Sequence, residues 1–455
     1  MRPSRFNRLV RAQDGAWLLF NAYTTALAEI EPDDLAFVRA CLEDPGGTSP
    51  ADDHQRELLD GLERGGFLVE DGVDELARIK VATFRDRFRT DRLMLTIAPT
   101  LDCNFRCDYC YEEHLRVTMS GPVRQALVEW VEAQARGLTA LWVTWYGGEP
   151  LLPRSREAIG ELTDGFRRIA AEHGLDYGAE LVTNGYLLDR ATMQEMLELG
   201  VERVQVTLDG PREIHDRRRI LVGGAGTFDR IVANLEEVMD LVEIQLRINV
   251  DRRNAMSCLE VVELLVERGM ARMVRPYIAQ VTMDGAACGN IQEACYSSAE
   301  FARTEVEIYR EAARRGLPLG RYPVRIPGAF CTADRVNAFV VGPSGLLFKC
   351  WHEVTLDPSR AVGSVVDGQE PWQKAIEDRW LAWDPFEKKG CRECDILPIC
   401  HGGCPLEALE HPERDRGSCE RYRYNLDGIL EVRRLARERL PSAPHSRGGA
   451  PGDEA

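Results

Sequence analysis

The chain has 455 residues, of which 44% are hydrophobic and 29% charged, so an ordinary globular protein of roughly two to four domains is expected. Its formal net charge of -17 argues against nucleic-acid and anionic-membrane partners, because both require a basic surface. No secretory signal and no apolar run of transmembrane length is evident, which predicts a cytoplasmic protein. Fourteen cysteines in a reducing compartment indicate metal ligands or catalytic groups rather than disulfides.

Residues 1–90 are expected to form a small separate module. The order of its predicted elements is two strands of a hairpin around the turn Gln13-Asp14-Gly15, two helices and a short final strand. They are expected at Phe6–Val10, Ala16–Phe20, Pro32–Leu42, Asp53–Arg64 and Phe67–Glu70. This order is typical of a winged helix; the alternative is a cap that only covers the following domain.

Residues 91–318 alternate regularly between apolar, β-branched runs and helical patterns. The expected strands are Leu93–Ile97, Ala140–Trp145, Gly178–Val182, Arg203–Leu208, Ile244–Val250 and Met273–Ile278. The helices between them are expected at Pro122–Ala135, Arg154–Ala171, Arg190–Glu198, Thr227–Leu241 and Ala255–Arg268, with a further one at Ala299–Arg315. Alternation of this kind produces parallel strands with right-handed crossovers. Six such units without a dinucleotide fingerprint predict an α/β fold, a partial (β/α)6 TIM-like barrel open on one side.

Residues 319–440 lose this alternation and become rich in Cys, Gly, Pro and Trp. Such a segment has little apolar material for a core of its own, so something other than burial is expected to stabilise it. A last helix is predicted at Tyr422–Arg437. The tail, residues 441–455, is rich in Pro, Gly and Ser and is expected to be disordered.

The first cysteine motif, Cys103-Asn104-Phe105-Arg106-Cys107-Asp108-Tyr109-Cys110, directly follows the first barrel strand. Three thiolates can hold three irons of a four-iron cubane and leave the fourth iron open. An open iron can chelate S-adenosylmethionine (SAM), and one electron then splits the sulfonium C–S bond to release a 5′-deoxyadenosyl radical. Zinc is the alternative, but structural zinc sites use four ligands, and no fourth ligand lies nearby in the sequence.

Polar residues follow four later strands of the predicted barrel. The second strand leads into Tyr146-Gly147-Gly148-Glu149-Pro150, where glycines allow close backbone approach to a ligand and Glu149 can accept a hydrogen bond from the SAM ammonium. The next three are followed by Thr183-Asn184-Gly185, Thr207-Leu208-Asp209 and Asn249-Val250-Asp251. Each alone is an ordinary turn or helix cap. Together they lie at the carboxyl ends of the strands, where barrel enzymes build their sites.

The cysteine triplet, the Gly-Gly-Glu-Pro loop and the strand-end polar groups resemble the radical SAM superfamily. That resemblance implies that Cys103, Cys107 and Cys110 ligate a [4Fe-4S] cluster and take part in catalysis. It also implies that residues 147–150 (Gly147, Gly148, Glu149 and Pro150) hold the methionine end of SAM. Thr183, Thr207 and Asn249 are further candidate SAM contacts.

Seven cysteines near the C-terminus follow a second pattern. Cys331 is followed by thirteen residues, Gly345, four residues and Cys350; then come Cys391-x2-Cys394-x5-Cys400-x3-Cys404 and Cys419. This arrangement is similar to the SPASM domain, which carries two auxiliary iron–sulfur clusters. The resemblance implies a distal cluster on Cys391, Cys394, Cys400 and Cys419, and a proximal cluster on Cys331, Cys350 and Cys404. The fourth proximal position is either Cys295 or open, and an open position is favoured.

The competing interpretation of these cysteines is a zinc ribbon made of Cys391, Cys394, Cys400 and Cys404. It leaves three of the seven cysteines without a role. Outside the proposed clusters remain Cys41, Cys258, Cys288 and Cys295. Cys41 and Cys258 fall on predicted helices, where a buried free thiol is the ordinary expectation.

The resemblance implies an enzyme that modifies a ribosomally made precursor peptide, a maturase that forms a thioether or another crosslink. The N-terminal module resembles the peptide-recognition winged helix of such enzymes, in which a leader peptide adds a strand to an exposed sheet edge. The expected partners are therefore a precursor peptide with a leader segment and an external electron donor, with no nucleic acid and no membrane. One alternative is an anaerobic sulfatase-maturing enzyme, which forms formylglycine and needs an acidic group such as Asp209 or Asp251. Another is a non-catalytic iron–sulfur electron-transfer protein.

Overall fold

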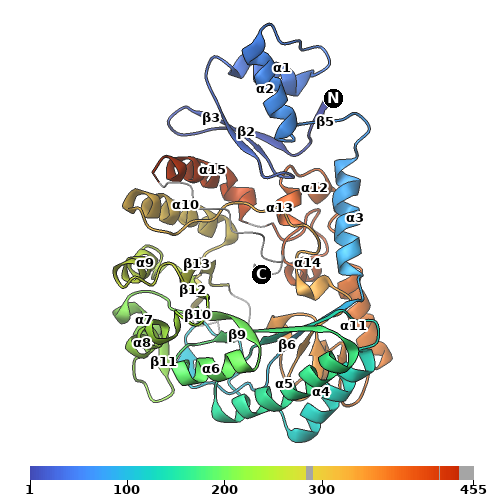
Figure 1. Cartoon of the computed structure of the whole chain (residues 1–455), viewed down its shortest axis with the longest axis vertical. Coiled ribbons are helices and arrows are strands. Elements are labelled where there is room, and N and C mark those ends of the chain that lie inside the picture. The colour runs from blue at the N-terminus through green and yellow to red at the C-terminus, as the bar shows by residue number, and fades with distance from the viewer. Residues whose placement is uncertain (283–290, 420, 440–455) are drawn as a thin grey trace.

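The computed structural model describes residues 1–282, 291–419 and 421–439. Cys288 and the predicted disordered tail lie outside these residues. Figure 1 shows three tiers: the N-terminal part at the top, two long helices with the cysteine-rich segment below it, and the large sheet with its helices at the bottom. No helix in the described part is long and apolar enough to cross a membrane.

The N-terminal part contains a three-stranded antiparallel sheet in the order β2-β3-β4 and three helices. Its elements are β1 (Arg2–Pro3), β2 (Asn7–Arg11), β3 (Trp17–Asn21), β4 (Leu27–Ile30), α1 (Leu35–Glu43), α2 (Asp53–Arg64), β5 (Leu68–Val69) and α3 (Glu75–Arg87). The predicted hairpin is present, with Leu9 opposite Leu19. The predicted strand at Phe67–Glu70 forms as β5, but it pairs with β1 rather than with a wing partner. Strand β4 and helix α3 were not predicted.

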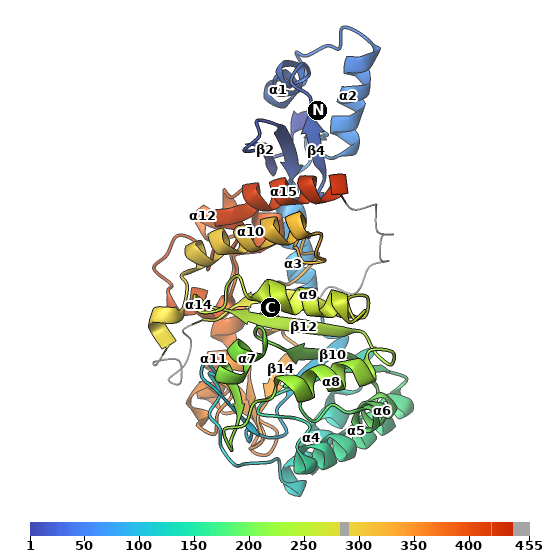
Figure 2. The ribbon, with the colours of Figure 1, turned by 90° about the vertical axis from the view of Figure 1, so that its left-hand side faces the viewer.

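The N-terminal sheet lies against the last helix of the chain, α15 (Tyr422–Arg439). Arg8 on β2 forms ion pairs with Asp395 at 2.9 Å and Asp427 at 2.7 Å. Arg434 on α15 lies 3.3 Å from Glu29 on β4. In Figures 1 and 2, α15 and α10 (Ser298–Arg315) lie between this sheet and the large sheet. The N-terminal part therefore contacts the cysteine-rich part and α15.

The central sheet confirms the predicted partial barrel. Its six parallel strands are β6 (Arg92–Ile97), β8 (Ala140–Trp145), β9 (Asp176–Thr183), β10 (Val201–Thr207), β12 (Ile244–Val250) and β13 (Val274–Gln280). Neighbours in the sheet follow one another in this order, and each adjacent pair is parallel. Because all six strands run in the same direction, their carboxyl ends lie at one edge of the sheet, as a barrel-type active site requires.

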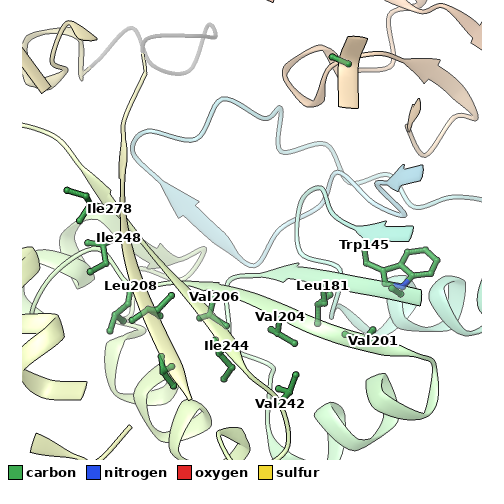
Figure 3. Packing of buried hydrophobic residues seen from close by; sticks show 14 of the residues in the cluster. Trp145, Leu181, Val201, Val204, Val206, Leu208, Val242, Ile244, Ile248 and Ile278 are labelled. Carbon is green, nitrogen blue, oxygen red and sulfur yellow. The ribbon is translucent and has the colours of Figure 1, made fainter. Parts of the chain in front are cut away.

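Helices connect these strands and cover the outer face of the sheet (Figure 1). They are α4 (Gly121–Gln134), α5 (Pro153–His173), α6 (Arg190–Glu198), α7 (Arg212–Arg218), α8 (Phe228–Val238) and α9 (Cys258–Glu267). Helix α5 begins with a proline in its first turn and ends at Gly174, whose φ of 69° gives the left-handed cap. Figure 3 shows the apolar side chains of neighbouring strands packed together, among them Leu181, Val204 and Ile244, each at most 1% exposed. This burial is the main stabilising contribution to the barrel.

The cysteine-rich segment extends the same sheet. Its strands β14 (Ala338–Val341), β15 (Leu346–Phe348) and β16 (Gly363–Ser364) continue the sheet beyond β6, and β14 pairs with β6 in parallel. Its helices are α11 (Pro371–Leu381), α12 (Lys389–Arg392), α13 (Leu397–Cys400) and α14 (Pro405–Glu410). Val341, Leu347 and Trp380 belong to the same buried cluster as the barrel strands. The segment thus shares the barrel's core, which the sequence had not revealed.

A second, small antiparallel pair was also missed. Strand β7 (Phe105–Cys107) lies within the cysteine triplet and pairs with β11 (Arg219–Leu221), which follows α7. Cys107 is directly opposite Arg219. The pair fixes the cysteine loop to the chain that leaves the fourth barrel strand.

Candidate functional site

The three cysteines of the first motif lie together in the loop after β6. Cys103, Cys107 and Cys110 are each partly buried, and Phe105 between them is fully buried. Burial raises the pKa of the Cys103 thiol to about 12, with further contributions from Glu149 and Cys107. Burial also raises the pKa of Cys110, and the charges of Glu112, Cys107 and Cys103 contribute to the increase. The three thiols are therefore within electrostatic reach of one another. With their pKa values raised in this way the free thiols stay protonated at neutral pH, so metal binding at this site would release protons.

The loop after β8 packs closely against the chain that leads into Cys103. Gly147 and Gly148 have φ angles of 78° and 50°, in the left-handed region that favours glycine. A Cβ atom on Gly147 would lie 2.4 Å from the Ala98 Cβ, and one on Gly148 would lie 2.2 Å from the Asp102 carbonyl oxygen. Pro150 is buried. Only glycine therefore allows this loop to lie beside the cysteine motif.

Glu149 is fully buried, and the protein itself engages its carboxylate. The Thr183 hydroxyl donates to it at 2.7 Å, the Asn184 amide at 2.8 Å and the Leu151 amide at 2.9 Å. A carboxylate has about four acceptor positions, so one position is left for a ligand. Glu149 thus joins the ends of β8 and β9, and its predicted hydrogen bond to SAM stays a prediction.

Thr183, Thr207 and Asn249 lie at or next to the carboxyl ends of β9, β10 and β12, as the sequence predicted. All three are buried, with at most 8% of each residue exposed. Thr183 donates to Glu149, as above, and the Asn249 amide nitrogen Nδ2 donates to the Tyr109 hydroxyl at 3.1 Å. The polar strand ends are thus brought to the edge of the sheet that carries the cysteine motif.

A buried charge network beneath the cysteine loop was not predicted. Arg219 donates to the Tyr109 hydroxyl at 2.6 Å, and Tyr109 donates in turn to Asp209. Arg218 lies 2.9 Å from Asp251. Burial opposes ionisation of Asp251, but Arg253 hydrogen bonds and the Arg218 charge hold its pKa below its usual value. Asp209 and Asp251 are therefore fully buried ion-pair partners rather than free acidic groups at the site.

The sequence did contain one signal for this network. Arg217, Arg218 and Arg219 are consecutive and follow the fourth strand end, which places them on the same edge as the cysteine motif. Arg218 and Arg219 are 3% and 7% exposed. Arginines this deeply buried require partners, and the polar strand ends supply them.

Cys331, Cys350 and Cys404 form a second group. Burial raises the pKa of Cys331 to about 12, with further contributions from Asp334 and Cys404. Burial also raises the pKa of Cys350, followed by the charges of Cys331 and Cys404. The three thiols that were predicted to hold a proximal cluster are therefore near one another.

Four further cysteines surround a separate, small cavity. Its lining includes Cys391, Cys394, Cys400 and Cys419. The Gly417 amide donates to the Cys391 sulfur at 3.1 Å, a contact typical of a thiolate. The zinc-ribbon alternative requires Cys404 in this group, whereas the cavity is lined by Cys419 and Cys404 lies with Cys331. The grouping into four and three cysteines corresponds to the distal and proximal sets.

The other described cysteines are separate from these groups. Cys41 and Cys258 are fully buried on α1 and α9, which confirms the prediction of buried helical thiols. Cys295 packs with Val281 and Tyr109, near the barrel edge. The charges that influence its pKa, after burial, are those of Asp251 and Arg253 rather than those of the proximal thiols. Cys295 is thus not placed as a fourth ligand of the proximal group.

The model of the family described as "Radical SAM superfamily" matches residues 97–270, from the end of β6 to the end of α9. The protein carries a radical SAM domain. This confirms the resemblance inferred from the cysteine triplet and the loop after β8. The domain's cofactors are a [4Fe-4S] cluster and SAM. The residues present fit these cofactors. Three neighbouring thiols can bind the cluster, and the glycine loop lies close beside the cysteine motif, where a side chain would clash.

Curated relatives share part of the chain. PqqA peptide cyclase of Ruegeria pomeroyi is 27% identical over 325 residues, which cover 68% of this chain and 80% of the relative. Fe-coproporphyrin III synthase of Methanosarcina barkeri is 26% identical over 175 residues, 38% of this chain and 41% of that protein.

Among solved structures, native anSMEcpe with bound AdoMet and the Kp18Cys peptide superposes with a TM-score of 0.59. The alignment covers 76% of this chain and 99% of that one at 18% identity. At this identity the similarity shows a common fold. The partial barrel and the cysteine-rich extension of its sheet fall within an established architecture.

Proposed function

We propose that the protein is a radical SAM enzyme that modifies a ribosomally made precursor peptide, by a thioether or another crosslink. The observation that supports this most directly is the coexistence of three cysteine groups with an N-terminal sheet that has unpaired edges. The relative that matches most of the chain is named a peptide cyclase. A peptide-bound structure has the same fold.

In this proposal the first cysteine group holds the SAM-binding cluster, and the other two groups hold auxiliary clusters. The ligands are Cys103, Cys107 and Cys110; Cys331, Cys350 and Cys404; and Cys391, Cys394, Cys400 and Cys419. When bound, the SAM-binding cluster supplies the electron that cleaves SAM to a 5′-deoxyadenosyl radical, which takes a hydrogen atom from the peptide. Residues 147–150 position the methionine end of SAM, with Thr183, Thr207 and Asn249 at the strand ends around it. The fourth position of the proximal site is open in this proposal.

The proposed division of the chain is a peptide-recognition module (1–90), the radical SAM partial barrel (91–318), a SPASM domain (319–440) and a tail (441–455). The module would bind the leader peptide through a sheet edge. Within the part of the chain that the structure describes, strands β2 and β4 each pair with β3 alone, so both leave backbone groups for an added strand. A bound leader raises the local concentration of the core peptide at the barrel.

A sulfatase-type maturase is the less favoured alternative. It requires an acidic group near the substrate, and Asp209 and Asp251 were the candidates. Both are fully buried and hydrogen-bonded or ion-paired to Asn249, Arg218 and Arg253.

The net charge of -17 supports the absence of nucleic acid as a partner. The abundance of cysteines supports a reducing, cytoplasmic compartment with an external electron donor.

The decisive experiment is co-expression with the short peptide encoded next to the gene, followed by mass spectrometry. A loss of hydrogen mass that localises to the core of the peptide is expected. A Cys103→Ala variant should abolish it and the release of 5′-deoxyadenosine from SAM. If the wild-type protein forms no 5′-deoxyadenosine under anaerobic reduction, the enzyme proposal is wrong; deoxyadenosine without peptide modification would contradict only the substrate class.

The leader-binding step has its own test on β4. The hydrogen-bonded register of β3 and β4 places the Glu29 amide on the outer side of the edge strand. Glu29→Pro removes that donor while the pairing with β3 is kept. Glu29→Ala is the matched control, because it removes only the ion pair with Arg434. Weaker leader binding in the proline variant alone is expected; equal binding in both would contradict use of the β4 edge.

A further inference from the structure

Four aromatic rings from three loops meet between the first cysteine group and the proximal group. The Tyr111 ring stacks on the His352 ring, with centroids 4.2 Å apart and planes 9° from parallel. The Tyr146 ring lies 4.8 Å from the Trp351 ring. The hydroxyls of Tyr111 and Tyr146 are hydrogen-bonded to each other. The four rings, called here the aromatic bridge, therefore form one connected contact.

The position of each ring in the chain gives the bridge its significance. Tyr111 directly follows Cys110, and Trp351 and His352 directly follow Cys350. Tyr146 directly precedes the glycine loop. Tyr111, which follows Cys110 of the first cysteine group, thus contacts His352, the second residue after Cys350 of the proximal group.

The bridge is also held in place on its barrel side. The Gly148 amide donates to the Glu112 carboxylate at 2.6 Å, which fixes the residue after Tyr111 against the glycine loop. Tyr146 is 8% exposed. Burial raises the pKa of its hydroxyl, and the charges of Cys110 and Cys350 both raise it further, so this one ring is near a thiol of each site.

Electrons tunnel more readily through bonded and closely packed atoms than across gaps. A path from Cys350 to Cys110 through the bridge consists of covalent bonds and one stacked ring contact, that of Tyr111 with His352. Stacking at this distance is the favoured packing of aromatic rings and keeps their π systems in contact. The bridge thus has the geometry of a through-protein electron path.

We propose that the Tyr111–Tyr146–Trp351–His352 bridge conducts single electrons from the proximal site to the SAM-binding site. In one transfer the proximal site is oxidised by one electron and the SAM-binding site is reduced by one. No bond forms or breaks in the rings and no proton moves, because the rings act only as the medium. The inference rests on the proposed function and extends it: the electron that peptide oxidation leaves at the proximal site returns to cleave the next SAM.

The test uses the reconstituted holoenzyme with SAM as the only added ligand, so no peptide is needed. All clusters are reduced by photoreduced deazaflavin, the reductant is removed, and SAM is added anaerobically. Each SAM cleaved consumes one electron and releases methionine, and the deoxyadenosyl group leaves as 5′-deoxyadenosine after taking a hydrogen atom from buffer. The wild type is expected to form more than one 5′-deoxyadenosine per chain while the electron paramagnetic resonance (EPR) signal of the reduced proximal cluster decays.

The variant that breaks the bridge combines Trp351→Leu and His352→Leu. It is expected to release one 5′-deoxyadenosine per chain and to retain the EPR signal of the reduced proximal cluster. The conservative pair Trp351→Phe with His352→Phe keeps two rings and should restore the decay of that signal. His411→Leu, at a histidine of the same segment whose side chain is 44% exposed, is the control for loss of a ring elsewhere.

Tyr111→Leu interrupts the bridge from the barrel side and leaves the Cys350 loop unchanged. If the variant with Trp351→Leu and His352→Leu fails to bind the proximal cluster, Tyr111→Leu provides the test instead. Decay of the proximal signal at the wild-type rate in both leucine variants would overturn the inference. A wild type that stops at one 5′-deoxyadenosine with its proximal signal intact would overturn it as well. A wild type that forms none would instead contradict the proposed function on which it rests.

Discussion

Arg219 donates a 2.6 Å hydrogen bond to the hydroxyl of Tyr109, the residue that precedes Cys110. The same hydroxyl donates to Asp209 and accepts a second hydrogen bond from Asn249. One phenol oxygen thus connects a buried cation, a buried anion and the end of β12. The loop that presents the first cysteine group is held by this contact as well as by the β7–β11 pairing.

Tyr109→Phe should therefore destabilise the protein although it removes a single oxygen atom. Arg219 and Asp209, which are 7% and 0% exposed, would each lose a hydrogen-bond partner, at a cost of about 1–3 kcal/mol. The measurement is urea unfolding of the cluster-free protein, together with the iron content after reconstitution. Tyr424→Phe, at a residue that is 49% exposed, should change stability by less than about 0.5 kcal/mol. Equal unfolding midpoints for the two variants would show that the network contributes nothing.

Gly148→Ala should impair SAM binding. The new Cβ would overlap the Asp102 carbonyl oxygen and must adopt a left-handed conformation, which alone costs roughly 1–2 kcal/mol. The loop can relieve the overlap only by moving away from the cysteine motif. SAM affinity is measured by the change in the EPR spectrum of the reduced protein on SAM addition, and at least a tenfold loss corresponds to about 1.4 kcal/mol.

The matched control for this exchange is Gly160→Ala on α5. Nothing lies within 4 Å of its Cβ position, and the residue is in the interior of a helix. The exchange should stabilise the protein by about 0.5–1 kcal/mol and leave SAM binding unchanged. If Gly148→Ala binds SAM as well as Gly160→Ala does, the loop does not hold the cofactor.

The grouping of the C-terminal cysteines predicts that alanine variants within one group lose the same iron–sulfur cluster. In a protein that lacks the first cysteine group, Cys404→Ala and Cys331→Ala should remove the same EPR signal. Cys419→Ala and Cys391→Ala should remove the other, each with loss of roughly four irons per chain. Cys41→Ala, at a buried thiol in the N-terminal part, should lose no iron. Loss of a single zinc ion from both Cys391→Ala and Cys404→Ala would instead support the zinc ribbon.

Much of the barrel could be predicted because its signals are local. The expected bounds of β8, β12 and α6 coincide with the observed ones, since apolar periodicity within each element is strong. Helix α3 could have been found as well, because Asp74 caps it by accepting from the Ala77 amide, an ordinary start signal. The strands β4, β7 and β11 are three or four residues long, too short for any periodicity to show.

The candidate ligands of the site could be predicted from the sequence, but the contacts that hold them in place could not. Spacing predicts which cysteines are the candidate ligands, yet only the fold brings Cys404 to Cys331 and Cys419 to the cavity with Cys391. Arg219 reaches the cysteine loop through a strand pairing between distant segments, which no local pattern encodes. The contact between Tyr111 and His352 likewise depends on how the cysteine-rich segment extends the sheet beyond β6.

His215 should make the stability of the protein depend on pH below neutrality. Its Nδ1 accepts from the Asp209 amide at 3.2 Å and its Nε2 lies 3.0 Å from the Thr227 hydroxyl, an arrangement of the neutral ring. Burial, together with the Arg219 charge, lowers the pKa of His215 to about 3, whereas the unfolded chain has a value of about 6.5. Because the folded pKa is depressed, the full stability is present above the unfolded pKa and is lost as pH falls toward the folded one. Between pH 7 and pH 5 the loss is about 2 kcal/mol.

The measurement compares wild type with His215→Gln, which cannot take up this proton. The variant should be less stable at pH 7, since it lacks the fitted ring, but the difference between the two proteins in unfolding free energy should shrink by about 2 kcal/mol at pH 5. His411→Gln, at a histidine whose side chain is 44% exposed, controls for the loss of a histidine as such and should follow the wild type. A constant difference between wild type and His215→Gln across this range would mean that the ring takes up its proton in the folded protein as easily as in the unfolded chain. That result would exclude the neutral, buried arrangement that positions the Asp209 backbone beneath Tyr109.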